Sequence, residues 1–301
     1  MPPTGRFAPS PSGPLHFGSL VAAVASYCQA RSQQGRWLLR IENVDTPRVV
    51  GGAADQIQRD LEAFGFAWDG PVLQQSDQFE QYRYYLDKLL DQGDCYACEC
   101  SRRSLREQGV RSGPLGQIYP GNCRHKRLAP AGRSIRLNTA DAQLIGFSDQ
   151  VYGRFELNLT AAVGDFVLRR VDDIYAYHLA VVVDDELQGV DEIVRGADLL
   201  ENTCLHLLLQ RKLGFATPRY LHVPLASNAQ GVKLSKQSGA AAIDHERAPQ
   251  LLLAALRHLG QPADDAMLQA NPGEILNRAI AEWNTAAIPA RLAASAETFG
   301  S

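Results

Sequence analysis

A loop rich in proline and glycine, placed between a short apolar segment and an alanine-rich one, constrains the fold of this chain most. Its sequence, PSPSGPLHFGS, covers residues 9–19. Proline fixes φ and glycine frees it, so the run predicts a shaped loop before a helix over 19–34 that Gly35 closes. A helix N-terminus presents unpaired N–H groups and a partial positive charge, so a loop of small residues with His16 suits a phosphate.

The segments around this loop predict alternating strands and helices. Short strands are expected at Arg6-Phe7-Ala8 and over 37–41, and a helix over 52–64. A strand over 72–75 follows, with Ser76 as the cap of an amphipathic helix that ends near Gly93. Such alternation is typical of a parallel sheet covered by helices.

The alternation breaks after Gly93 and resumes later. Residues 95–130 are rich in Cys, Gly, Pro and Arg, and we interpret them as an insertion held by something other than a core. Regular structure is expected again in these segments: 134–137, 166–170, 180–183, a helix over 202–213, and a helical tail that begins at 251–259 and runs to the end.

Composition indicates an ordinary globular protein with one sizeable domain and an insertion, or two domains. The 301 residues are 45% hydrophobic and 21% charged. No apolar run approaches the roughly 20 residues that span a membrane, and the N-terminus lacks the pattern of a secretory signal. We therefore expect a cytoplasmic protein without a membrane partner.

The net charge of −3 indicates no general attraction to nucleic acid, so any RNA contact needs a local patch. Residues 102–136 hold nine Lys and Arg against one acid, Glu107. This segment is either an RNA-binding patch or a solvated face, and the sequence leaves both open.

Three of the six cysteines have the spacing of a structural zinc site. Cys98, Cys100 and Cys123 lie in two short segments, and their thiolates could hold together a loop that has no hydrophobic core. Spacing alone makes His125 the candidate for the fourth ligand. Three free thiols are the alternative. The other cysteines, Cys28, Cys95 and Cys204, are interpreted as buried or incidental thiols.

Two further motifs allow more than one interpretation. Lys233 and Lys236, in KLSKQ, could wrap a polyphosphate or could belong to an exposed basic loop. Asp184 and Asp185 could hold a metal, but we favour the interpretation that these two aspartates fix a turn and hold basic neighbours.

Together these motifs resemble class I aminoacyl-tRNA synthetases. PSPSGPLHFGS and KLSKQ are similar to the HIGH and KMSKS signatures, and two more stretches resemble the glutamyl branch, RIENVDTPR at 40–48 and VVVDDELQGVDEIVRGADLL at 181–200. The resemblance covers about residues 5–238. It implies an α/β, Rossmann-like catalytic domain with a small zinc-binding insertion and a short helical C-terminal subdomain. The expected units are 1–94 and 131–240 for the two catalytic halves, 95–130 for the insertion and 241–301 for the helical subdomain.

The resemblance also implies an ATP site. His16 and Lys236 are the catalytic pair for the phosphates, Lys233 supports them, and Mg²⁺ would bridge phosphate oxygens. Gly18 and Ser19 let phosphate approach the helix start. Ser19 stands where the signature has histidine, and we do not expect this to abolish function.

For glutamate, the resemblance implies side chains at the carboxyl ends of the strands. Arg6 suits the side-chain carboxylate and Glu42 the ammonium group, while Tyr177 and Arg195 occupy substrate-contacting positions. An internal salt bridge of Arg6 and Glu42, and core packing of Tyr177, are the alternatives. The remaining implied contacts are Phe7, Ala8, Pro9 and Ser10.

This chain departs from the family pattern at one position of the glutamate site. Val181 stands where discriminating relatives commonly have Asn, so one polar contact to glutamate is expected to be missing. For the zinc site, the resemblance points to Tyr119 instead of His125 as the fourth ligand.

About sixty residues follow Lys236, which is too few for the anticodon-binding domains of a usual glutamyl-tRNA synthetase. The truncated relatives with this plan are glutamyl-queuosine tRNA(Asp) synthetases. The resemblance thus implies a ligase that activates glutamate without tRNA and esterifies it to queuosine, with ATP, L-glutamate and the anticodon stem-loop of tRNA(Asp) as partners. A monomer is expected. A minimal synthetase that charges the tRNA 3′ end, and a non-catalytic paralogue that binds RNA or adenylate, are the alternatives.

Overall fold

A central parallel sheet positions the residues singled out above. The computed structural model describes residues 2–227 and 241–295. A first sheet has the parallel strands β1 (Thr4–Phe7), β2 (Arg36–Ile41) and β3 (Leu73–Gln74). A second has, in order, β11 (Glu192–Gly196), β12 (Arg219–Val223), β8 (Ile145–Asp149) and β9 (Gly153–Leu157). The two meet at β1 and β11, where the Asp191 N–H donates to the Thr4 carbonyl oxygen at 3.1 Å.

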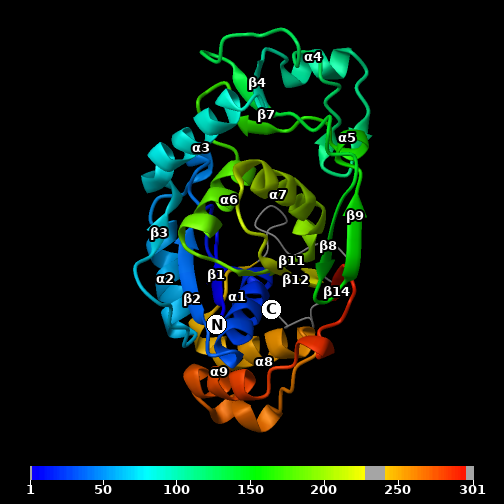
Figure 1. The fold of residues 1–301 in the computed structure, drawn as a ribbon. Coiled ribbons are helices and arrows are strands. Elements are labelled where there is room, and N and C mark those ends of the chain that lie inside the picture. Colours follow the sequence, from blue (N-terminus) through cyan, green and yellow to red (C-terminus); the bar gives the residue numbers. More distant parts are fainter. Residues whose placement is uncertain (1, 228–240, 296–301) are drawn as a thin grey trace.

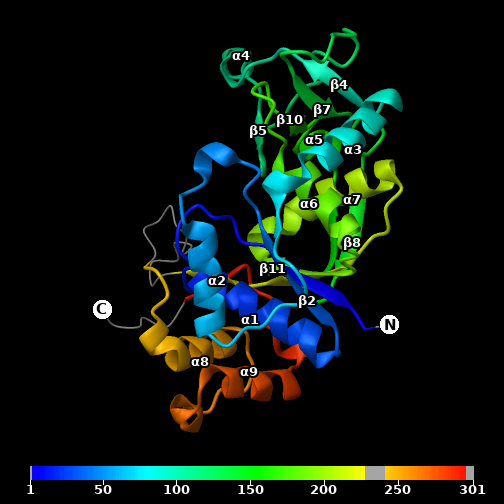
Figure 2. The same cartoon turned by 90° about the vertical axis from the view of Figure 1, so that its left-hand side faces the viewer.

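Helices cover both faces of this sheet (Figures 1 and 2). One group consists of α1 (Phe17–Ser32), α8 (Ala248–His258) and α9 (Pro272–Ala281). The other consists of α3 (Phe79–Asp91), α6 (Tyr177–Leu187) and α7 (Leu200–Leu213), while α2 (Ala53–Ala63) follows β2. Every residue of α1 from Leu20 to Ala30 except Ala22 is buried. A helix that is apolar all round belongs inside a protein, which explains why the alanine-rich run lies between the sheet and the C-terminal helices.

The cysteine-rich region lies at the opposite end of the molecule from α8 and α9 (Figure 1). Its sheet consists of β10 (Val167–Arg169), β7 (Ser134–Leu137) and β4 (Cys95–Cys98). Around it are α4 (Arg102–Glu107), β5 (Ser112–Gly113), β6 (Gly116–Gln117) and α5 (Leu159–Ala162). Cys98, Leu105, Tyr119 and Cys123 form a small buried cluster of their own, so the expected metal-binding side chains are themselves the centre of this region.

Three local predictions were wrong. Ser76 does not cap α3, because it lies in a 3-10 turn over 75–78 and Gln78 precedes the helix. Asp184 and Asp185 lie in α6 and not in a turn. The tail is not wholly helical, since β14 (Ala293–Ser295) pairs in parallel with β13 (Leu225–Ser227).

The run 180–183, which the sequence left without a defined element, belongs to α6, where Val181, Val182 and Val183 are buried. Tertiary burial here outweighs the β preference of valine. The boundaries proposed at 94, 130 and 240 stay predictions. No helix in the described ranges is long and apolar enough to cross a lipid bilayer.

Candidate active site and metal centre

The proline-rich loop delivers His16 to the start of α1. Two backbone hydrogen bonds hold the loop against the segment after β2: the Glu42 N–H donates to the Pro9 oxygen at 3.0 Å, and the Val50 N–H to the Pro11 oxygen at 2.9 Å. His16 is the N-cap of α1, and its Nδ1 accepts from the Ser19 N–H at 3.2 Å. Gly18 and Ser19 therefore occupy the first turn, where the helix dipole favours an anion.

Buried charges meet below this loop. The Asp185 carboxylate accepts from Nε of Arg6 at 3.0 Å and from Nη2 of Arg40 at 2.7 Å. Nη1 of Arg6 also donates to the Val194 oxygen at 3.3 Å, which ties β1 to β11. Arg6 thus has an internal ion pair, but its partner is Asp185 and not Glu42.

Glu42 follows β2 and lies 3.6 Å from Nη2 of Arg40. Burial raises the pKa of its carboxyl from 4.5 to about 7, although Arg40 and Arg6 oppose the shift. Asp184 accepts from Gln75 and from the Tyr82 hydroxyl. The expectation that the two aspartates hold basic neighbours is confirmed for Asp185, which bonds both arginines.

Arg40 is a residue that the sequence interpretation missed. It is wholly buried in the middle of this charge cluster. A signal was present, because Arg40 opens the motif RIENVDTPR, but the sequence does not reveal which acids it meets.

Arg195 lies near the carboxyl end of β11 among neutral partners. Its Nε donates to His222 Nε2 at 3.2 Å, and its Nη1 lies 3.2 Å from His206 Nδ1 and 3.4 Å from the Tyr177 hydroxyl. Its Nη2 donates to the Thr203 hydroxyl at 2.7 Å. Tyr177 is therefore in contact with Arg195, as expected if both residues belong to one substrate site. Sequence analysis offers no signal that selects His206, His222 or Thr203.

A cavity of about 1570 Å³ joins this region to the cysteine-rich one. Ser10, Glu42, Tyr177 and His178 line one end, and Cys98 and Cys100 line the other. Phe7 instead stacks on Trp37 inside the core, with ring centroids 6.2 Å apart, so only its backbone is available to a ligand. Ala8 is half-buried and Pro9 is buried. Lys233 and Lys236 lie outside the described residues.

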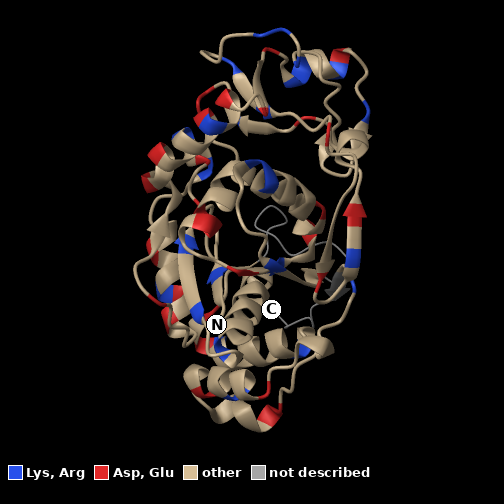
Figure 3. Ribbon diagram, viewed as in Figure 1, with Lys and Arg blue, Asp and Glu red and all other residues tan. Residues whose placement is uncertain are grey.

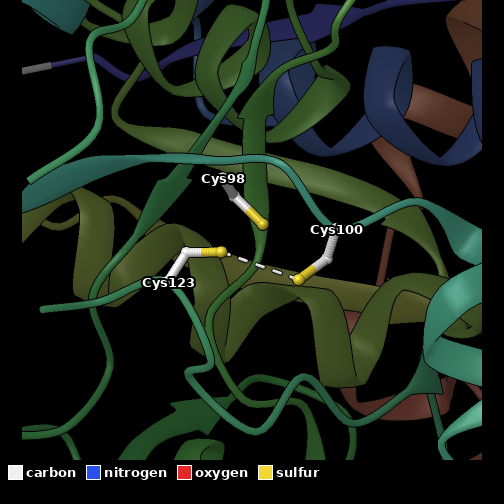
Figure 4. Close-up of side chains that lie close together, drawn as sticks. All are labelled: Cys98, Cys100 and Cys123. Carbon is white, nitrogen blue, oxygen red and sulfur yellow. Dashed lines mark hydrogen bonds between the residues drawn. The ribbon is translucent and has the colours of Figure 1, made fainter. Parts of the chain in front are cut away.

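The three cysteines expected to bind metal come together (Figure 4). Their sulfur atoms all lie within 4.8 Å of one another, and Sγ of Cys100 is 3.6 Å from Sγ of Cys123. The Tyr119 oxygen lies 3.2 Å from Sγ of Cys98 and 3.7 Å from Sγ of Cys100. His125 is exposed and outside this group.

These distances fit a tetrahedral ion. Zinc bonds thiolate at about 2.3 Å, which separates two sulfur ligands by about 3.8 Å. The cluster of Cys98, Cys100 and Cys123 could therefore hold a metal, with the Tyr119 oxygen at the distance of a fourth donor. Cys28, Cys95 and Cys204 are buried free thiols, as expected.

Figure 3 shows Lys and Arg along the ribbon at the cysteine-rich end of the molecule, where the basic segment over 102–136 lies. Their contacts and exposure divide the cations of this segment into two groups. Arg124 is bonded to buried Asp165, which also accepts from Tyr96, and Arg136 lies over the Tyr119 ring at 3.9 Å. These cations are structural. Several others are exposed: Arg102, Arg103, Arg106, Arg111, Lys126 and Arg127.

Comparison with known proteins agrees with this architecture. The model of the family "tRNA synthetases class I (E and Q), catalytic domain" matches residues 4–270. The fold, the loop at the start of α1 and this match make the chain a class I tRNA synthetase of the E and Q group.

Its relatives place it more narrowly. The chain is 50% identical over 291 residues to the Glutamyl-Q tRNA(Asp) synthetase of Dechloromonas aromatica, covering 96% of each chain. It is 51% identical to the protein of that name from Pseudomonas entomophila, over 93% of this chain and 92% of the relative. Within the class, the chain belongs to the family of glutamyl-Q tRNA(Asp) synthetases.

Solved structures share the fold. Glutamate-tRNA synthetase from Elizabethkingia anophelis superposes with a TM-score of 0.82 at 24% identity, over 99% of this chain and 68% of that one. The glutamate tRNA ligase of Elizabethkingia meningosepticum, in complex with its amino acid, gives 0.81 at 24% identity, over 99% and 67%. The predicted α/β synthetase fold is thereby confirmed.

Proposed function

We propose that this ligase activates glutamate with ATP, without tRNA, and transfers the glutamyl group to the queuosine base at the wobble position of tRNA(Asp). The observation that carries the proposal is the convergence of Arg6, Glu42, Tyr177 and Arg195 near one end of the cavity. The charges of Arg195, Glu42 and Arg6 all act on the Tyr177 hydroxyl. Two cations, one acid and a phenol match the groups of glutamate, and the names of the relatives agree.

In this site, Arg195 and Arg6 face the side-chain carboxylate and Glu42 takes the ammonium group. An oxygen of the α-carboxylate attacks the α-phosphorus of ATP and pyrophosphate leaves. A hydroxyl of the queuosine diol then attacks the glutamyl carbonyl carbon and AMP leaves. Ser10, Phe7, Ala8 and Pro9 would shape the loop side of the pocket.

The start of α1 supports the nucleotide part. His16, with Gly18 and Ser19 in the first turn, forms a cradle for phosphate oxygens. Lys233 and Lys236 would neutralise the charge that builds during transfer. Mg²⁺ bound with ATP would supply further neutralisation.

We assign the metal centre to Cys98, Cys100, Cys123 and Tyr119, with Zn²⁺ as a structural ion. Thiolates and an oxygen donor in a closed tetrahedral set are typical of structural zinc. Its place within a small cluster of the insertion agrees with a role in folding that region.

The anticodon stem-loop would meet the exposed cations of the insertion. Arg102, Arg103 and Arg106 line the cavity between the insertion and the glutamate site, so they lie where a splayed loop could enter. Such a tRNA substrate implies action in the cytoplasm.

The test is ATP-dependent transfer of labelled glutamate to tRNA from cells that make queuosine and to tRNA from cells that cannot, with His16→Ala as the inactive control. We expect label only in the queuosine-containing pool. Equal label in both pools would mean 3′ charging, and no label in either pool would reject the proposal.

A further inference from the structure

The surroundings of Arg195 differ from those of the other buried arginines at the site. Arg6 and Arg40 both donate to the Asp185 carboxylate. Arg195 is only 6% exposed, yet within the described ranges no carboxylate lies within 4 Å of its guanidinium group. Burying a cation without a counterion costs free energy, so the neighbours of Arg195 must compensate by accepting its hydrogen bonds.

Those neighbours are neutral acceptors in defined protonation states. A guanidinium group only donates, so His222 Nε2 and His206 Nδ1, at 3.2 Å each, must carry no proton. His222 then has its proton on Nδ1, 2.7 Å from Asp149. His206 has its proton on Nε2 and donates to Nδ1 of His178 at 3.1 Å.

The hydroxyl of Thr203 completes the set. It accepts from Nη2 of Arg195 at 2.7 Å and can donate to the Leu199 oxygen at 3.1 Å. Burial lowers the pKa of His206, His178 and His222, and the charge of Arg195 lowers each further. At His222 the hydrogen bond to Asp149 opposes this shift, but the pKa still lies below its ordinary value, which favours the neutral imidazole. Arg195 is thus held in one orientation by groups that do not cancel its charge.

We propose that His206, His222 and Thr203 are positioning residues that hold Arg195 on neutral acceptors, so that its charge stays available to a side-chain carboxylate and the site selects glutamate over glutamine. This inference rests on the proposed function.

The physical reason lies in the shape of the two amino acids. Glutamate and glutamine are nearly isosteric, so packing alone separates them poorly. A guanidinium group gains charge-assisted, bidentate bonds only from the carboxylate. If an acid of the protein paired with Arg195, as Asp185 pairs with Arg6, this advantage would be small.

An isosteric pair of variants at one position separates charge from packing. His206→Asn keeps a neutral acceptor near the place of Nδ1, whereas His206→Asp puts a carboxylate there. We measure KM and kcat for glutamate and glutamine in ATP–pyrophosphate exchange, and glutamate affinity by calorimetry. Cys204→Ala, on the same helix and facing the Ile145 oxygen, controls for a changed α7 core.

We expect His206→Asn and Cys204→Ala to keep the preference for glutamate within about threefold of wild type. His206→Asp should raise the KM for glutamate by about tenfold or more and reduce the preference by a similar factor, with a smaller change in kcat. Equal preference in the Asn and Asp variants, or loss of preference in both, would overturn the inference.

Two further results keep the test decisive. If His206→Asp does not fold, Thr203→Asp compared with Thr203→Asn repeats the comparison on Nη2 of Arg195. A wild-type enzyme that activates glutamate and glutamine equally well would overturn the inference alone. A wild-type enzyme that activates neither would instead overturn the proposed function.

Discussion

Replacing Arg40 with methionine tests the buried charge cluster below the glutamate site. Arg40 has no exposed surface, and its Nη2 lies 2.7 Å from Asp185 and 3.6 Å from Glu42. Its Nη1 donates to Gln188 at 2.8 Å, and its Nε lies 3.9 Å from Asp184. Methionine keeps an unbranched apolar stem of similar shape, so the substitution removes mainly the charge and the hydrogen bonds.

The magnitude follows from the charges that remain. Glu42, Asp184 and Asp185 share two guanidinium groups in the wild type and would share only Arg6 in the variant. Removing one partner of a buried ion pair costs about 3–5 kcal/mol, a large part of the roughly 5–15 kcal/mol that stabilises a domain. The pKa of Glu42 should rise further, because Arg40 is the first charge that lowers it, so the KM for glutamate should rise as well.

Urea denaturation followed by circular dichroism measures the free energy of unfolding, and the KM comes from ATP–pyrophosphate exchange. Arg103→Met is the matched control, since Arg103 pairs with Glu107 at 2.8 Å but its side chain is 84% exposed. Exposed pairs contribute about 0–1 kcal/mol, so the control should stay near wild type. A loss below about 1 kcal/mol in Arg40→Met, or an equal loss in both variants, would refute the reasoning.

Three other predictions concern the acid of the site, the metal centre and the start of β2. Burial raises the pKa of Glu42 from 4.5 to about 7, so the folded state keeps a proton that the unfolded chain loses, and this group's stabilising contribution falls as pH rises from 4.5 to 7. Denaturation curves of Glu42→Gln should lack this slope, and the wild-type KM for glutamate should fall as pH rises through 7. Identical pH profiles of the two proteins would contradict this prediction. In competition with a chromogenic chelator, Tyr119→Phe should bind zinc at least about tenfold more weakly than wild type, and His125→Ala should bind zinc as wild type does. The reverse result would identify His125 as the fourth ligand instead of Tyr119. Gly35→Ala should lower the free energy of unfolding by about 1–3 kcal/mol, because the new Cβ would lie 2.3 Å from the Pro3 oxygen, and an unchanged urea midpoint would show that the loop adjusts freely.

The sequence by itself determined the order of the catalytic elements. The loop before α1, the strands at each end of that helix and the helix over 202–213 were predicted close to their observed places, because period, proline and glycine act over a few residues. The same local logic selected Cys98, Cys100 and Cys123. Arg6 and Glu42 were assigned to glutamate by the resemblance, and their positions at strand ends agree with that assignment.

Tertiary structure decided which charges meet. Arg40 and Asp185 are 145 residues apart, and no periodicity relates them. The run of valines at 181–183 became helical because α6 is buried against its neighbours, which outweighs a weak local preference. The pairing of β13 with β14 likewise joins distant segments that local signals cannot connect.

The environment of Arg195 shows most clearly the difference between what the sequence determines and what tertiary structure determines. Sequence resemblance singled out the arginine, but its neutral acceptors come from α7 and β12, and His222 in turn contacts Asp149 at the end of β8. A sequence records that these histidines exist, whereas their tautomers depend on which donor and acceptor face each ring nitrogen. Only the folded chain brings these three acceptors within 3.2 Å of the guanidinium nitrogens of Arg195, with no carboxylate of the described ranges within 4 Å of that group.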